Sequence, residues 1–76
     1  MYVRIAKVGQ ALFEGEALSV SVPGTEGDMT ILPHHSALIS ALRDGTVKVL
    51  TSETTETFEI TKGLIEVSNN EVIVLL

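Results

Sequence analysis

The stretch PGTEGDMTILPHHSAL, residues 23–38, joins an acidic loop rich in turn formers to a short apolar segment and a proline corner. Glycine reaches positive φ without steric cost and proline fixes φ near −65°, so turns are predicted at Pro23-Gly24 and Glu26-Gly27-Asp28. Residues 29–32 are predicted to form a strand. Pro33 ends that strand because it has no backbone N–H to donate. The tip of the loop is therefore expected to stand in solvent.

Alternation of apolar and polar residues dominates the rest of the chain, and no window carries the apolar stripe of a helix. In residues 17–22 this pattern predicts Leu18, Val20 and Val22 on the buried face. Their neighbours Ala17, Ser19 and Ser21 are expected to face solvent. Strands are expected at residues 3–8, 12–13, 17–22, 29–32, 37–42, 46–50, 57–61, 64–67 and 72–75.

Turn signals separate these segments and indicate how two of them pair. Asn69 and Asn70 tolerate the left-handed backbone that a tight hairpin needs, so residues 64–67 are expected to pair with residues 72–75. A turn is also expected at Gly15. Turns spaced in this way predict an all-β domain over residues 1–76, a sandwich or flattened barrel of about eight to ten short strands.

Composition excludes several classes of function. The chain has 76 residues, a net charge of −5 and no cysteine. Its five basic residues are scattered, which argues against nucleic acid, because phosphate contacts need clustered Lys and Arg. Without cysteine there is no disulfide or thiolate metal site. Because no apolar run is long enough for a signal peptide or a membrane span, we expect no direct membrane insertion.

The chain resembles the N-terminal domain of the epsilon subunit of F-type ATP synthases, the subunit called delta in mitochondria, over its whole length. Two departures concern the corner: family members usually carry glycine where this chain has His34 and proline where it has Ala37. A third is Met29-Thr30, where the family commonly has a bulky residue followed by glycine. The resemblance rests on an ordered series: Leu12-Phe13-Glu14-Gly15-Glu16, Val22-Pro23-Gly24, Glu26-Gly27-Asp28, Ile31-Leu32-Pro33, His35, Leu38, Ala41-Leu42, Gly45, Gly63, Glu66-Val67 and Val72 to Leu75.

The resemblance implies a two-sheet β-sandwich and a non-catalytic rotor subunit that joins the gamma shaft to the c-ring of a proton- or sodium-translocating enzyme. Such a subunit lies peripherally on the cytoplasmic face of the bacterial plasma membrane, or on the matrix or stromal equivalent. The residues implied in contact with the c-ring are Glu26, Gly27 and Asp28, and those implied in contact with gamma are His35, Ser36 and Leu38. The family's full-length form adds a C-terminal helical hairpin, and no helical pattern follows within these residues, so inhibitory regulation is not expected from them.

Each implied contact has a simpler alternative. Asp28 could be an ordinary solvated carboxylate, and His35 a partly buried corner residue bonded to backbone. His34 and His35 are neighbours in an extended segment and point to opposite faces, so they are poorly placed to share a metal ion. Adjacent positions also do not direct the Ser36 hydroxyl at the His35 ring, and no glycine-rich loop leads into a helix that could hold phosphate. No catalytic, metal or cofactor site is expected.

Two segments, residues 37–42 and 72–75, are apolar on both faces. One explanation is burial on both sides, and the other is that a docking partner covers one face. A domain of this size exposes roughly 4,500 Å², and a standard interface takes about 800 Å² from each partner. The alternative function is therefore a free-standing acidic β-sandwich that binds some other protein as an adaptor; a small hydrolase is a more distant third.

Overall fold

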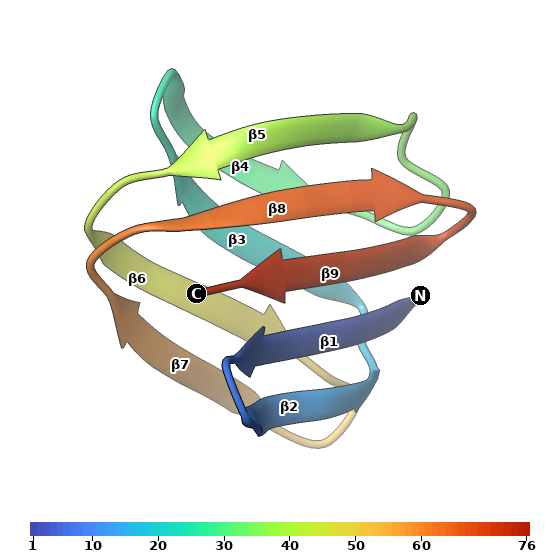
Figure 1. Cartoon of the computed structure of the whole chain (residues 1–76). Coiled ribbons are helices and arrows are strands. Elements are labelled where there is room, and N and C mark those ends of the chain that lie inside the picture. Colours follow the sequence, from blue (N-terminus) through green and yellow to red (C-terminus); the bar gives the residue numbers. More distant parts are fainter.

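The computed structural model describes all 76 residues and consists of strands and connecting turns (Figure 1). The all-β prediction and the expected number of strands are confirmed. No helix in the structure is long and apolar enough to cross a bilayer. The strands are β1 (Tyr2–Lys7), β2 (Gln10–Glu16), β3 (Ser19–Gly24), β4 (Gly27–Ile31), β5 (Leu38–Leu42), β6 (Gly45–Leu50), β7 (Thr55–Ile60), β8 (Gly63–Ser68) and β9 (Glu71–Leu75).

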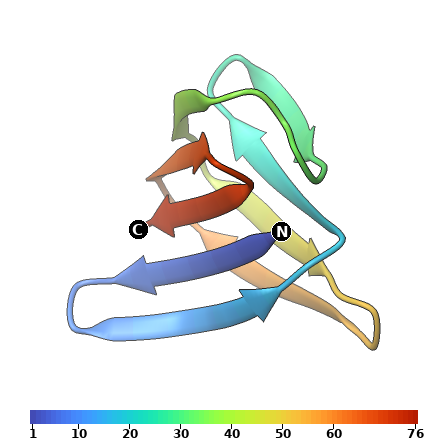
Figure 2. The ribbon, with the colours of Figure 1, turned by 90° about the vertical axis from the view of Figure 1, so that its right-hand side faces the viewer.

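The strands form one curled sheet that folds into two layers (Figure 2). The order is β2-β1-β9-β8-β5-β3-β6-β7, with β4 on the other side of β3. Strands β2, β1, β9, β8 and β5 make the front layer, and β4, β3, β6 and β7 make the back layer (Figure 1). A single residue pair, Gly24 with Leu42, joins the layers between β3 and β5. The two-sheet sandwich is thus confirmed, and its two sheets are continuous through this one pair.

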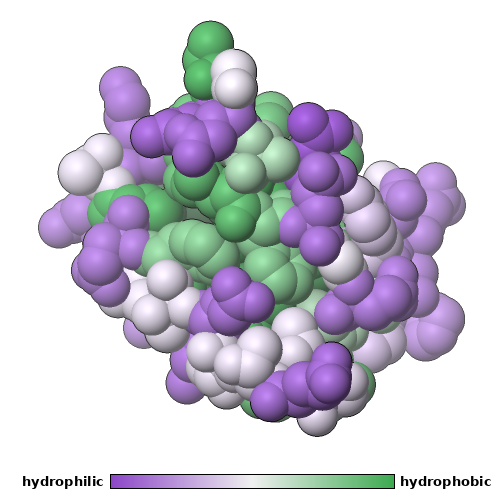
Figure 3. All heavy atoms as spheres, turned by 90° about the horizontal axis from the view of Figure 1, so that it is seen from below, coloured by the Kyte–Doolittle hydropathy of each residue, from purple (hydrophilic) through white to green (hydrophobic).

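Apolar side chains from both layers meet in one core of 14 buried residues. Fully burying a Val or Ile side chain stabilises a fold by about 1.5–3 kcal/mol, so this core dominates the stability. The end strands β2 and β7 meet at the underside through Phe13 and Phe58, whose ring centroids lie 6.4 Å apart. From below, hydrophobic residues occupy the middle of this face inside a hydrophilic rim (Figure 3). The fully buried members of the core are Val3, Ile5, Val20, Ile31, Val47, Val49, Ile65, Val72 and Val74.

The alternation predicted for residues 17–22 is correct for Val20 and Val22 and wrong at the start of the segment. Ala17 is only 5% exposed, whereas Leu18 is 52% exposed. The strand begins at Ser19, so the period of two does not extend back through the bend at Leu18. Three other predicted turns differ from the structure: Gly15 lies inside β2 opposite Val3, Pro23-Gly24 ends β3, and Gly27-Asp28 begins β4, so that only Thr25 and Glu26 form the turn.

The β8–β9 hairpin has the predicted pairing, with Leu64 opposite Leu75 and Val67 opposite Val72. Asn69 and Asn70 at its turn have φ values of 51° and 60°. These left-handed values match the twist of a two-residue hairpin, which is why a pair of asparagines serves there. The side chain of Asn70 also accepts a hydrogen bond of 2.8 Å from the backbone N–H of His34. The hairpin turn therefore supports the proline corner.

His34 adopts a φ of 66°, a left-handed conformation at the position where glycine is usual in the resembled family. A left-handed backbone costs a residue with a Cβ atom about 1–2 kcal/mol. Glycine in turn loses about 0.5–1 kcal/mol of additional chain entropy on folding. We expect His34→Gly to raise the free energy of unfolding by roughly 0.5–1 kcal/mol in urea titrations. His35→Gly is the control and should lower it, because His35 has no positive φ to relieve.

Tyr2 on β1 donates a 2.9 Å hydrogen bond to the carboxylate of Glu14 on β2. This bond raises the pKa of the Tyr2 hydroxyl above its usual value of about 10, and burial and the negative charge of Glu14 add to it. The hydrogen bond therefore stabilises the folded state below a pH of about 10, and this stabilisation is lost as the pH rises through the folded-state pKa of Tyr2. Tyr2 is the only tyrosine, so absorbance of tyrosinate should report this titration directly. Glu14→Gln should lower the pKa, and an unchanged titration would contradict the assignment.

Candidate interaction surfaces

The acidic hairpin, residues 25–28, consists of the turn after β3 and the first two residues of β4, at the top of the molecule (Figure 1). All four residues are exposed, as the sequence predicted for the tip of this loop. Asp28 is 81% exposed in its side chain and forms an ion pair of 2.6 Å with the Arg43 guanidinium. Glu26 forms no ion pair, and Gly27 has a φ of 134° that favours glycine. The hairpin therefore presents one free carboxylate and one that is held in place.

Backbone hydrogen bonds attach this hairpin and the end of β3 to the end of β5 and the connection that follows it. The Thr25 N–H donates to the Ala41 carbonyl at 3.0 Å, and the Arg43 N–H donates to the Pro23 carbonyl at 2.9 Å. Together with the Asp28–Arg43 pair, these bonds hold the hairpin and the adjoining end of β3 at three points. Sequence reasoning missed Arg43, because no local pattern relates residues 28 and 43. The signal that could have found it is the basic residue just before Asp44-Gly45, at the corner where the two layers join.

The proline corner, residues 32–37, lies at the opposite end of β5 from that connection (Figure 1). His35 is exposed, so the burial expected in the simpler alternative is wrong, whereas the bonding to backbone that it expected is present. Its backbone N–H donates to the Leu32 carbonyl at 3.2 Å, and its Nδ1 lies 2.7 Å from the Ser36 carbonyl oxygen. The ring thus engages the backbone of Ser36 and not its hydroxyl, which is not the geometry of a nucleophile and its base.

Leu38 was predicted to lie in the same contact as His35 and Ser36. Unlike those two exposed residues, it is partly buried. It pairs with the buried Val67 and packs against the core, so only part of its side chain reaches solvent. Its neighbour Ile39 points outward instead and is 67% exposed. A hollow of about 360 Å³ follows this end of β5 and β8, lined by Ala37, Leu38, Ile39, Glu66, Val67 and Ser68.

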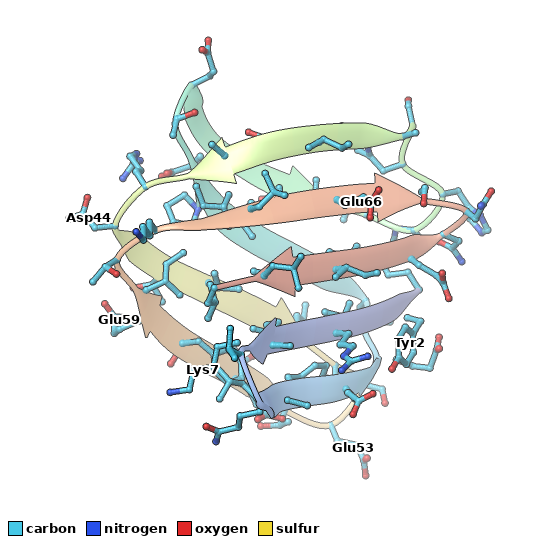
Figure 4. The ribbon with its side chains drawn as sticks, viewed as in Figure 1. Tyr2, Lys7, Asp44, Glu53, Glu59 and Glu66 are labelled. Carbon is cyan, nitrogen blue, oxygen red and sulfur yellow. The ribbon has the colours of Figure 1, made fainter.

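An apolar strip crosses the outer face of the front layer. It consists of two rows of outward-facing residues that cross the adjacent strands β5, β8 and β9. Glu66 on β8 is the one charged residue in these rows (Figure 4). The idea that β5 and β9 are covered on both sides is wrong, because Ile39 and Leu75 remain more than half exposed. We define the outer strip as Ile39 and Ala41 on β5, Leu64 on β8, and Ile73 and Leu75 on β9.

The molecule exposes 4553 Å² in total, close to the area expected from its mass. Sequence reasoning anticipated an apolar strip on β5 and β9 and did not include Leu64 of β8. That residue is opposite both Ala41 and Leu75, so it joins the apolar positions of β5 and β9 into one surface. No group of three or more His, Asp or Glu side chains is placed to hold a metal ion.

Comparison with known families gives one match, which covers residues 1–76. The matching family is described as the beta-sandwich domain of the ATP synthase Delta/Epsilon chain. The chain belongs to this family. The resemblance noted in the sequence is thereby confirmed over the full length of the chain, and so is the sandwich fold that it implied.

Among curated relatives of this Delta/Epsilon domain, the ATP synthase epsilon chain of Bordetella avium is 40% identical over 76 residues. That alignment covers 99% of this chain and 54% of the relative. The epsilon chain of Desulforudis audaxviator is 37% identical over 73 residues, covering 96% of this chain and 53% of the relative. The chain thus spans about half the length of the curated relatives it matches.

Solved structures with the same fold include chains from two mitochondrial enzymes. A chain in the Euglena gracilis ATP synthase structure that contains OSCP, F1 and the c-ring superposes with a TM-score of 0.88 at 17% identity. It covers 96% of this chain and 48% of the other. A chain in the central stalk and c-ring of the Tetrahymena thermophila enzyme gives 0.84 at 15% identity, with 97% and 60% covered. At these identities the likeness concerns the fold.

Proposed function

We propose that this domain is a non-catalytic part of the central stalk of an F-type ATP synthase, where it joins the gamma shaft to the c-ring. Membership of the Delta/Epsilon family over all 76 residues carries this proposal. Two separate surfaces support it, one acidic and one apolar, because a connector needs a contact for each partner.

The acidic hairpin is the proposed c-ring contact, through Glu26, Gly27 and Asp28. A carboxylate has about four lone-pair sites, so Asp28 can keep its bond to Arg43 through Oδ1 and still accept a partner's guanidinium on Oδ2. The ring loops of the resembled family commonly carry arginine, which fits this acceptor. The hairpin would then face the membrane-embedded ring, and the domain would lie peripherally on the cytoplasmic side or its matrix or stromal equivalent.

The proline corner and the outer strip are the proposed gamma contact, with His35 and Ser36 at the corner and Leu38 beside them. The corner leads directly into β5, whose outward residue Ile39 begins the strip. An exposed apolar strip of this kind on a small domain marks a protein contact. Removing it from water on binding would supply the main favourable term, and the polar corner would fix the orientation.

Co-purification tests the proposal. The tagged chain should retain both the gamma subunit and the c-ring of the matching enzyme, each also when the other is absent. Retention of neither would remove the proposal and favour the alternative of a free-standing acidic adaptor.

Inverted vesicles containing Asp28→Lys should in addition hydrolyse ATP with less proton pumping, because the reversed charge faces the ring. Intact coupling between hydrolysis and pumping would remove Asp28 from the contact.

A further inference from the structure

A groove of about 510 Å³ opens on the outer face of the back layer, directly beside the acidic hairpin. Ten residues from β3, β4, β6 and the β5–β6 connection line it, and only two of them are hydrophobic. Two of the five basic residues of the chain, Arg43 and Lys48, lie in this groove, against one carboxylate, Asp28. A second carboxylate, that of Glu59 on β7, borders the groove and accepts a hydrogen bond from the lining residue Thr46.

The cations in the groove differ in their availability. Arg43 is engaged with Asp28, and its second hydrogen bond goes to the Asp44 carbonyl. Lys48 makes no ion pair and no side-chain hydrogen bond, and it is exposed on β6. The neighbouring hydroxyls of Ser21 and Thr30 bond to each other at 3.2 Å. Lys48 is therefore the cation in the groove whose ammonium has no hydrogen-bond acceptor.

The sheet register fixes how far this donor lies from the acidic hairpin. Asp28 is opposite Pro23, and Lys48 is opposite Ser21, which precedes Pro23 by two residues on β3. With strands about 4.8 Å apart and a rise of about 3.4 Å per residue, the Cα atoms of Asp28 and Lys48 are about 12 Å apart. An extended segment spans that distance with about four residues.

We propose that the c-ring contact continues from the acidic hairpin into this groove, with Lys48 as its second anchor. This rests on the proposed function. The occupant is a polar loop of a ring subunit, bound in extended form, with a guanidinium on Asp28. Arg43 and Lys48 would repel a loop that carried only positive charge. The loop must therefore also bring a carboxylate or carboxamide oxygen to Lys48, three or four residues from its arginine.

Binding of the chain to immobilised, detergent-solubilised c-ring of the matching enzyme tests this inference. Lys48→Glu should weaken binding at least tenfold, Lys48→Gln should weaken it less, and Lys48→Arg should retain it. The matched control is Lys62→Glu, which makes the same charge change between β7 and β8 and should stay within twofold of the unmodified chain. Because Lys48 is exposed, urea unfolding of its variants should be unchanged.

The outcomes separate the two proposals. If Asp28→Lys abolishes binding while Lys48→Glu has no effect beyond that of Lys62→Glu, the contact ends at the hairpin and the groove proposal is overturned. The proposed function then stands. If the unmodified chain does not bind the ring at all, both fail. Restoration of binding to Lys48→Glu by a lysine introduced at the acceptor position of the ring loop would support direct contact.

Discussion

Replacing Ile39 with lysine is expected to weaken binding to the gamma subunit by at least tenfold while leaving the fold intact. Ile39 has the most exposed large side chain of the outer strip and is not part of the buried core. Glu66 lies directly opposite on β8, so the new ammonium gains a cross-strand partner in the free domain. In the complex the same charge must leave water within an apolar contact, which costs several kcal/mol unless it is well paired.

Titration calorimetry with purified gamma would measure the loss, and urea unfolding would show that stability is retained. Thr55→Lys is the matched control, because it adds the same charge to the outer face of the back layer, on β7. It should bind gamma as the unmodified chain does. His35→Ala should weaken binding less than Ile39→Lys. Equal affinities for Ile39→Lys and Thr55→Lys would show that gamma does not dock on the outer strip.

Most of the fold could be predicted because its signals are local. A period of two within each strand identifies the buried face, and Asn69-Asn70 specifies the pairing of β8 with β9. The errors fall where a strand meets a bend. Leu18 is exposed because β3 starts one residue later, and nothing in the alternation marks that boundary. Gly15 resembles a turn residue, yet it lies opposite Val3 in an extended strand.

The candidate surfaces were predicted less completely because they depend on contacts between distant residues. The acidic hairpin is readable from glycine and carboxylate spacing, and its exposure followed. Its partner Arg43 is 15 residues away and reaches it only because β5 and β3 meet at the corner between the layers. The outer strip likewise needs β8 between β5 and β9, an order that the chain sequence does not state.

Gly45→Ala is expected to lower the free energy of unfolding by about 2–4 kcal/mol, from overpacking and backbone strain together. A Cβ atom at position 45 would lie 2.9 Å from the Cβ and 3.1 Å from the Cγ of Pro23. The proline ring cannot rotate away, and Gly45 also has a φ of 155°. A domain of this length has a total stability of roughly 4–11 kcal/mol, so the loss would be a large part of it.

The same contact connects stability to the acidic hairpin, because Pro23 is paired with Asp28 on β4. Urea unfolding measures the loss, and Gly9→Ala is the matched control. Gly9 has a φ of 77° with no atom within 4 Å of its added Cβ, so Ala there should cost only about 1 kcal/mol of backbone strain. Equal losses for the two variants would show that contact with Pro23 contributes nothing. Pro23→Gly removes both clashing atoms, so in its background the extra cost of Gly45→Ala should disappear.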